Sequence, residues 1–184
     1  TFDLCGRYGF NLMCAPVFIS YLLYFSKVRP ASDNYGELIE VKQLQGSALN
    51  QVDDTIFRIR QLRGKWVLLT LDSSTCDEGC RKKLYYMRQV RLMQHTEKDR
   101  IERVWLIDDD GLPEPGLVEE YKGMWLINAK DSQLREEFPA PASQRDHIYL
   151  IDPVGNLMMR FPKEPDAAKI AKDIKKLLKV SQIE

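Results

Sequence analysis

The stretch "GKWVLLTLDSSTCDEGC" constrains the fold more than any other part of the chain. Within it, Lys65–Asp72 is a nearly continuous apolar run, which is typical of a strand buried on both faces of a sheet. Such a sheet needs helices packed against both of its faces. We therefore expect an α/β fold in which this strand is central.

A helix is expected directly after this strand. Ser73, Ser74 and Thr75 are candidate N-caps, and the acidic pair Asp77–Glu78 favours a helix N-terminus electrostatically. The helix should run through Cys80–His95. Its apolar side would carry Leu84, Met87, Val90 and Leu92/Met93, and its solvent side would carry most of Arg81, Lys82, Lys83, Arg88 and Arg91.

The rest of the C-terminal part alternates between strand and helix patterns. The segments "RVWLIDDD" and "MWLINA" predict two more buried strands, and "LPEPGLVEEYKG" and "DSQLREEF" predict short helices. The segment "HIYLIDPVGNLMMRF" predicts a hairpin that turns at "DPVGN", and "DAAKIAKDIKKLLKV" predicts a closing amphipathic helix. This order predicts one α/β domain over residues 55–184, with a mixed sheet and flanking helices.

The N-terminal part predicts a membrane anchor. No charged residue occurs from Gly9 to Ser26, and a span needs about 20 mainly apolar residues. A cleavable signal or a buried helix is the alternative, but no small-residue processing site follows the segment. We expect a tail at residues 1–8, a transmembrane helix at 9–27, and a polar linker at 28–54 that contains one short strand at Glu37–Val41.

Charge excludes one class of partner. The chain has 27 basic and 27 acidic residues and a formal net charge of zero, whereas nucleic-acid binders usually carry a basic surface. Two of the four cysteines, Cys5 and Cys14, lie near the N-terminus, so only Cys76 and Cys80 form a spaced pair. The chemistry of the domain should therefore centre on that pair.

Cys76 and Cys80 lie at the junction between the central strand and the helix. Residues four apart are neighbours on a helix, and the positive end of a helix dipole lowers a thiol pKa. The pair could close a disulfide, bind a soft ion such as Cu(I), or simply pack. In the redox interpretation Cys76, which is nearer the expected helix start, is the better attacking cysteine.

Histidine offers a possible third ligand. Of the two histidines, His95 lies at the polar end of the expected helix and is interpreted as a solvated surface residue. His147 directly precedes the strand "IYLID". It could approach the cysteine loop from a neighbouring strand, or it could cap the strand end without a function.

These motifs together resemble the Sco/SenC family of thioredoxin-fold proteins, and in particular short membrane-anchored members that are encoded with bacterial cytochrome oxidase genes. The resemblance runs from about Glu37 to the C-terminus. It implies a thioredoxin-like mixed sheet and one copper ion held by Cys76, Cys80 and His147. The family usually has prolines where this chain has Asp77 and Arg81.

The resemblance also implies a function and a location. Sco-like proteins deliver copper to the copper centre of cytochrome c oxidase, or keep its cysteines reduced, so oxidase subunits would be partners. The anchor would contact lipid in the bacterial inner membrane, with the soluble domain in the periplasm. Two alternatives remain: a general periplasmic thiol–disulfide oxidoreductase, and a non-catalytic subunit bound to a respiratory oxidase.

Overall fold

The computed structural model describes residues 34–181, together with residue 16 and residues 19–21. Cys5, Cys14 and most of the predicted anchor at 9–27 lie outside these residues. Among the helices that are described, none is long and apolar enough to cross a membrane. One compact unit begins at Asn34 and contains every element discussed below.

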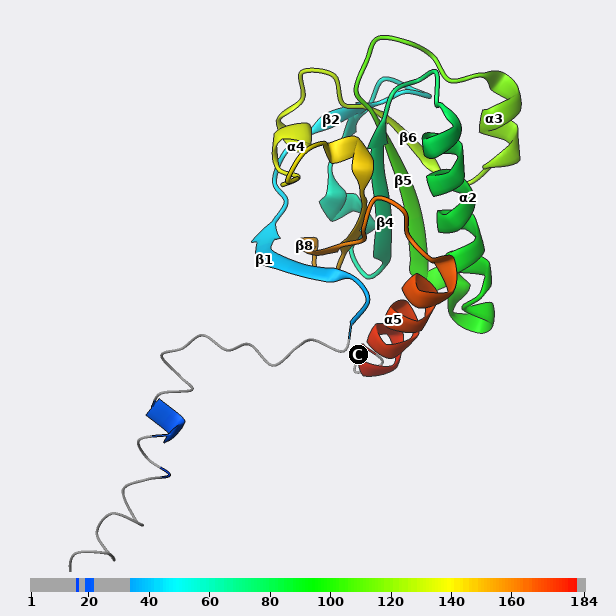
Figure 1. Cartoon of the computed structure of the whole chain (residues 1–184). Coiled ribbons are helices and arrows are strands. Elements are labelled where there is room, and N and C mark those ends of the chain that lie inside the picture. The colour runs from blue at the N-terminus through cyan, green and yellow to red at the C-terminus, as the bar shows by residue number, and fades with distance from the viewer. Residues whose placement is uncertain (1–15, 17–18, 22–33, 182–184) are drawn as a thin grey trace, which may run out of the picture. The chain divides into compact units, whose positions relative to one another are not determined.

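The core of this unit is an eight-stranded mixed sheet (Figure 1). The strands lie in the order β1-β8-β7-β4-β5-β6-β2-β3. Strand β4 pairs with β5 in parallel and with β7 antiparallel, so the expected central strand is central. The bounds are β1 Glu37–Gln43, β2 Ala48–Asn50, β3 Ile56–Phe57, β4 Trp66–Asp72, β5 Ile101–Ile107, β6 Trp125–Asn128, β7 Ile148–Ile151 and β8 Asn156–Arg160.

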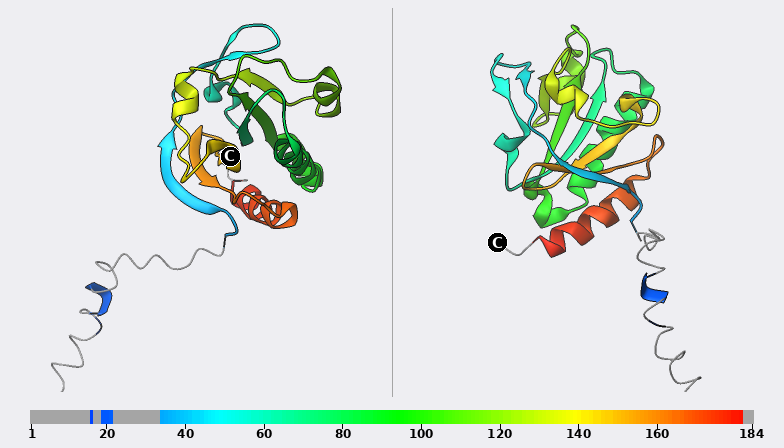
Figure 2. Two further views of the ribbon diagram at one scale, coloured as in Figure 1. Left: turned by 45° about the horizontal axis from the view of Figure 1, so that its top comes forward. Right: turned by 90° about the vertical axis from the view of Figure 1, so that its left-hand side faces the viewer.

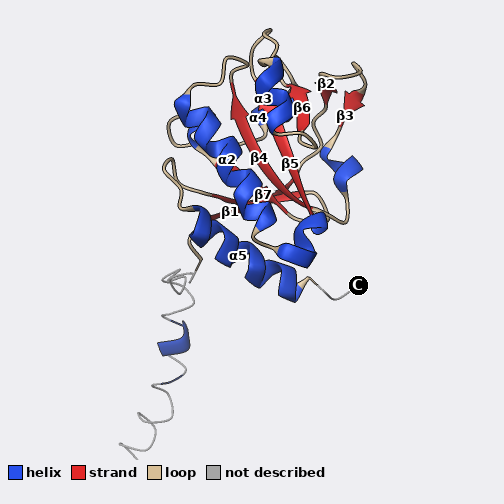
Figure 3. Cartoon of the chain, turned by 90° about the vertical axis from the view of Figure 1, so that its right-hand side faces the viewer, coloured by secondary structure: helices blue, strands red, loops and turns tan. Residues whose placement is uncertain are grey.

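Helices cover both faces of the sheet, as predicted. They are α2 Glu78–Leu92, α3 Pro115–Glu120, α4 Gln133–Glu136 and α5 Ala167–Val180, with 3-10 turns η1 Ile59–Leu62, η2 His95–Arg100 and η3 Gln144–Asp146. Helices α2 and α5 lie together on one face (Figure 3). Helix α4 and turn η1 pack on the other face, across the sheet from α2 (Figure 2).

Part of the predicted linker at 28–54 is not a linker. Strand β1 pairs antiparallel with β8, and β2 pairs with β6, so both belong to the sheet. The single short strand expected at Glu37–Val41 exists and is longer than predicted. Because β1 lies at the sheet edge and six of its seven residues are exposed, it lacks the apolar alternation that would have marked it as a structural strand.

A buried carboxylate fixes the start of the domain. Asp173 of α5 is only 3% exposed, and its Oδ2 accepts hydrogen bonds from the backbone N–H groups of Tyr35 at 2.7 Å and Gly36 at 3.0 Å. A side chain at position 36 would begin 2.3 Å from the sulfur of Met159. The segment ahead of β1 is therefore closely docked against α5 and β8.

Candidate functional site

Cys76 and Cys80 form a disulfide, with 5.0 Å between their Cα atoms. The two sulfurs therefore meet, as predicted, but the local geometry differs from the expected one. The N-cap of α2 is Asp77, whose carboxylate accepts from the N–H of Cys80 at 2.9 Å. Cys76 thus precedes the helix, and its φ of 42° places it in the left-handed region, which is uncommon outside glycine.

The prediction of an N-cap among Ser73, Ser74 and Thr75 is accordingly wrong. The carboxylate of Asp77 is the stronger acceptor for an orphan backbone N–H at a helix start. As a result, Cys80 occupies the third position of α2, where the positive end of the helix dipole acts most strongly. Cys76 reaches Cys80 from the preceding loop and not from the same helix face.

The disulfide is buried. Each cysteine is 1% exposed, within an apolar cluster that contains Leu84, Trp105, Ile107, Leu117, Tyr121 and Leu126. On its other side, Cys80 lines a cleft of about 480 Å³ between α2, η3 and the loop ahead of α5. Cys76 does not line that cleft, so Cys80 is the cysteine next to open space.

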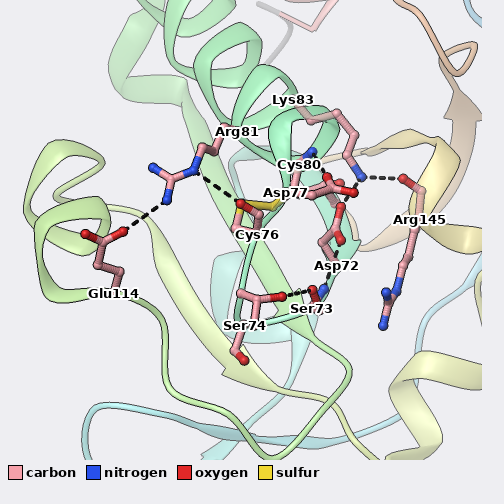
Figure 4. Close-up of a disulfide and its surroundings, with 12 residues drawn as sticks. Asp72, Ser73, Ser74, Cys76, Asp77, Cys80, Arg81, Lys83, Glu114 and Arg145 are labelled. Atoms are coloured by element: carbon pink, nitrogen blue, oxygen red, sulfur yellow. Dashed lines mark hydrogen bonds and ion pairs between the residues drawn. A yellow bond between two sulfur atoms is a disulfide. The ribbon is translucent and has the colours of Figure 1, made fainter.

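Asp77 and Arg81 replace the prolines of the family pattern, and each has a structural role (Figure 4). Asp77 caps α2. The Nε of Arg81 donates to the carbonyl of Cys76 at 3.2 Å, and its Nη2 pairs with Glu114 at 3.0 Å. Arg81, at the start of α2, therefore stabilises the left-handed backbone conformation of Cys76.

A buried ion pair lies beside the disulfide, at the end of β4. The Nζ of Lys83 lies 2.7 Å from Oδ2 of Asp72 and also donates to the carbonyl of Arg145 (Figure 4). The second carboxylate oxygen of Asp72 accepts from the N–H of Ser73 at 2.9 Å. Lys83 was expected on the solvent side of α2, yet it is 5% exposed, because Asp72 supplies a counter-ion beneath the helix.

The loop after β5 holds the cysteine loop in place. The carboxylate of Asp109 accepts from the N–H of Ser74 at 3.1 and 3.2 Å and from that of Gly111 at 3.0 Å. Burial raises the pKa of Asp109, but the hydrogen bonds from Ser74 and Gly111 outweigh it, so the net shift is downward. Its neighbour Asp108 forms two hydrogen bonds with Arg145, at 2.8 and 2.7 Å.

His147 lies between η3 and β7, where its Nδ1 is 2.8 Å from the carbonyl of Phe161. A carbonyl can only accept, so Nδ1 is the donor in this hydrogen bond. With the cysteines joined, residues 34–181 contain no group of three His, Cys, Asp or Glu side chains suited to a metal ion. The ligand set Cys76, Cys80 and His147 therefore stays a prediction, whereas His95 is exposed, as expected.

Asp72, Lys83 and Asp109 were not predicted as site residues. The sequence does contain a signal for Asp72, because this residue ends an apolar strand only four residues before Cys76. A carboxylate at the end of a buried strand needs a partner, and Lys83 is the first lysine of α2 that can turn toward it.

Comparison with known proteins gives one family match. Residues 66–181 match the family model described as "Transmembrane-like, thioredoxin-like, C-terminal domain". No curated protein sequence matches the chain.

Three solved structures illustrate the structural likeness. Copper-bound yeast Sco1 has a TM-score of 0.59 at 16% identity, covering 74% of this chain and 92% of that chain. Copper-bound ScoI of Bradyrhizobium japonicum has a TM-score of 0.54 at 15% identity, covering 73% and 99%. The thioredoxin domain of a Bacteroides vulgatus thiol-disulfide oxidoreductase has a TM-score of 0.50 at 18% identity, covering 80% and 99%. These matches establish a thioredoxin-like fold that Sco proteins share.

Proposed function

We propose that this chain, which belongs to the transmembrane-like, thioredoxin-like C-terminal domain family, is a Sco-like accessory protein for cytochrome c oxidase that acts through the thiols of Cys76 and Cys80. The observation that carries the proposal is the disulfide at the start of α2, with Cys80 facing a cleft. The fold is shared with BsSco, described as a member of the Sco family of cytochrome c oxidase assembly proteins, which supports the oxidase as the client.

In this proposal, residues 9–27 anchor the chain in the bacterial inner membrane and the folded domain lies in the periplasm. An oxidising compartment of that kind allows a cysteine pair to cycle between dithiol and disulfide. The form in the structure is the oxidised product of one turnover.

The reductive step begins with the dithiol form. The thiolate of one cysteine attacks a disulfide of the oxidase copper centre, which gives a mixed disulfide and releases one client thiolate. The thiolate of the second cysteine then attacks the first, which releases the second client thiolate and forms the Cys76–Cys80 disulfide. Two electrons pass to the client, and the protons lost by Cys76 and Cys80 match those the client thiolates can take up.

The structure favours Cys80 as the attacking cysteine, in place of Cys76. Cys80 lines the cleft, and its position in the first turn of α2 stabilises a thiolate. Cys76 shares the apolar cluster with Cys80 but does not line the cleft, which suits the cysteine that attacks second and within the protein. Lys83 and Asp72 line the same cleft.

The order of attack can be tested with single-cysteine variants in a Cys5→Ser/Cys14→Ser background. We expect the Cys76→Ser protein, which keeps Cys80, to react with a chromogenic aromatic disulfide at least about tenfold faster than the Cys80→Ser protein, because a lower thiol pKa raises the thiolate fraction. A faster reaction of the Cys80→Ser protein would reverse the assignment.

The client can be tested in the same background. The reduced protein is mixed with a soluble copper-centre domain of the oxidase whose cysteines are oxidised to a disulfide, and free client thiols are counted by mass spectrometry after alkylation. We expect one client disulfide reduced per chain and no reaction with the Cys76→Ser/Cys80→Ser protein. Equal rates with an unrelated disulfide protein would instead indicate a general oxidoreductase.

Copper is the second proposed cargo, because two of the similar structures hold it. The residues as arranged do not fit a copper ion, since the disulfide occupies both sulfurs. Reduction would free two soft thiolates, which suit Cu(I), and the hydrogen bond of His147 uses Nδ1, which leaves Nε2 as the ring nitrogen that would bind a metal.

This second role predicts a graded loss of binding. After anaerobic Cu(I) loading of the reduced protein, Cys76→Ser and Cys80→Ser should each lose the bound ion, and His147→Ala should weaken Cu(II) more than Cu(I). One copper per chain in either cysteine variant would remove that cysteine from the site.

Persistent co-purification with the mature oxidase at fixed stoichiometry, without thiol reduction or copper binding, would indicate a resident subunit.

A further inference from the structure

A second pocket lies away from the disulfide, beside the C-terminal half of α2. It has a volume of about 360 Å³ and is bordered by α2, β5, the end of α3 and Lys122. Three arginines contribute to its wall: Arg88 and Arg91 from α2 and Arg103 from β5. No residue of this pocket takes part in the thiol chemistry proposed above.

Arg103 is the unusual member of the set. It is 6% exposed, and its Nη2 donates to the carbonyl of Lys122 at 3.0 Å. Its Nε is buried without any hydrogen-bond acceptor among the described residues. No carboxylate of those residues lies within ion-pair distance of the guanidinium, which therefore holds a buried charge against a single neutral oxygen.

The neighbouring arginines increase the local positive charge. Burial lowers the pKa of Arg103, and repulsion from Arg91 and Arg88 lowers it further. Arg91 is held in place by the carbonyl of Ile101 at 2.9 Å and by Asp99 at 2.9 Å. Arg88 forms no hydrogen bond or ion pair within residues 34–181, so its guanidinium is free to bind a ligand.

Several other arginines of the described residues do have carboxylate partners. Arg145 forms two hydrogen bonds with Asp108, and Arg160 forms two with Glu37, at 2.8 and 3.0 Å. A buried charge is normally paired, because desolvation without a counter-ion is costly. The arrangement at Arg103 indicates that its counter-ion comes from outside the described residues.

We propose that Arg88, Arg91 and Arg103 form a binding site for a small tetrahedral oxyanion of the phosphate-monoester type. Guanidinium groups from two elements can donate to several oxygens of one such anion. Glu119 and Glu120 also line the pocket, and the chain has no net charge. Both features disfavour the binding of a polyanion, whereas a single small anion can still be bound.

The test uses the full chain and inorganic phosphate, titrated calorimetrically in chloride buffer at fixed ionic strength, because the strength of charge–charge contacts depends on the salt concentration. We expect saturable binding of one phosphate per chain. Arg88→Gln/Arg91→Gln should weaken it at least about tenfold, since hydrogen bonds between charged groups are the strong ones. Arg60→Gln/Arg63→Gln, which removes the same charge from exposed positions, is the matched control and should change binding less than twofold.

A second arm distinguishes a free anion from a lipid headgroup. Vesicles of phosphatidylcholine with and without phosphatidic acid are sedimented with the parent chain and both double variants. Binding to phosphatidic acid that is lost only in Arg88→Gln/Arg91→Gln identifies the headgroup as a ligand; phosphate binding without vesicle binding identifies the free anion.

Equal results for the two double variants in both arms would overturn the proposal. So would the absence of saturable binding to both probes in the parent chain. The site is independent of the thiols, so the Cys76→Ser/Cys80→Ser protein should bind the same probe with unchanged affinity. Failure of the thiol assays would leave this result intact, and failure here would not affect the thiol chemistry.

Discussion

Helix α2 contains one buried cation, Lys83, and packs beside another, Arg103 of β5, and the two have opposite surroundings. Near its N-terminal end, Lys83 has a carboxylate partner at 2.7 Å and two backbone carbonyls around it. Beside its C-terminal half, Arg103 has one carbonyl and two other arginines. The first arrangement satisfies the charge internally and fixes the loop that carries Cys76. In the second arrangement no carboxylate of the described residues pairs with Arg103, and a bound anion could neutralise its charge.

The largest effect is expected from breaking the first pair. Lys83→Met leaves the carboxylate of Asp72 buried and unpaired, which should lower the free energy of unfolding by about 3–5 kcal/mol. Urea unfolding followed by circular dichroism measures the loss. Lys82→Met, at an exposed neighbouring position, is the control and should stay within about 0.5 kcal/mol. A loss under about 1 kcal/mol for Lys83→Met would mean that the pair is not buried in solution.

The helix cap at the same end should give a smaller effect. Asp77→Ala removes the acceptor for the N–H of Cys80 and should cost about 1 kcal/mol of unfolding free energy. Glu78→Ala, in the first turn but without a capping bond, is the comparison. If both variants lost the same amount, the contribution would come from negative charge near the helix dipole and not from the cap.

Acid should weaken the cysteine end through Asp109. Its folded pKa lies below the ordinary value near 3.9, so its stabilisation is complete above that value and is lost as pH falls through the folded pKa. Asp109→Asn should therefore be less stable than the parent at pH 7, and the difference should shrink below about pH 4. Urea midpoints measured across this range check the sign; a difference that grows on acidification would refute it.

Arg103→Met should have the smallest effect on stability and is the sharpest contrast with Lys83→Met. Because no carboxylate of the described residues pairs with the guanidinium, its replacement by an apolar side chain should change the unfolding free energy by less than about 1 kcal/mol, or increase it. The measurement is made without phosphate. A loss above about 3 kcal/mol would show that Arg103 has a structural partner, as Lys83 does.

The sequence predicted the order of the main elements because their signals are local. The apolar run at Lys65–Asp72, the turn in "DPVGN" and the apolar stripe of the last helix each depend on neighbouring residues alone. Strands β1 and β2 fall in the predicted linker because their apolar signals are weak: β1 is an edge strand with mostly exposed residues, and β2 has only three residues.

The candidate site was predicted in part. The meeting of Cys76 and Cys80 followed from their spacing, but the start of α2 did not, since Ser, Thr and Asp all cap helices and tertiary contacts decide among them. Lys83 and Arg103 were missed for a common reason. Amphipathic patterns assign charged residues to solvent, and only the tertiary structure shows that Asp72 meets one of them and that no carboxylate meets the other.

The contact between Asp173 and the peptide N–H groups of Tyr35 and Gly36 bears on how the folded part of this chain can be shortened. A truncated protein that began at Glu37 would keep every strand, yet it would remove both donors from a carboxylate with almost no access to water. Helix α5 would then carry a carboxylate that has lost both of its backbone donors. Shortened forms should therefore retain Asn34, even though no regular element begins there.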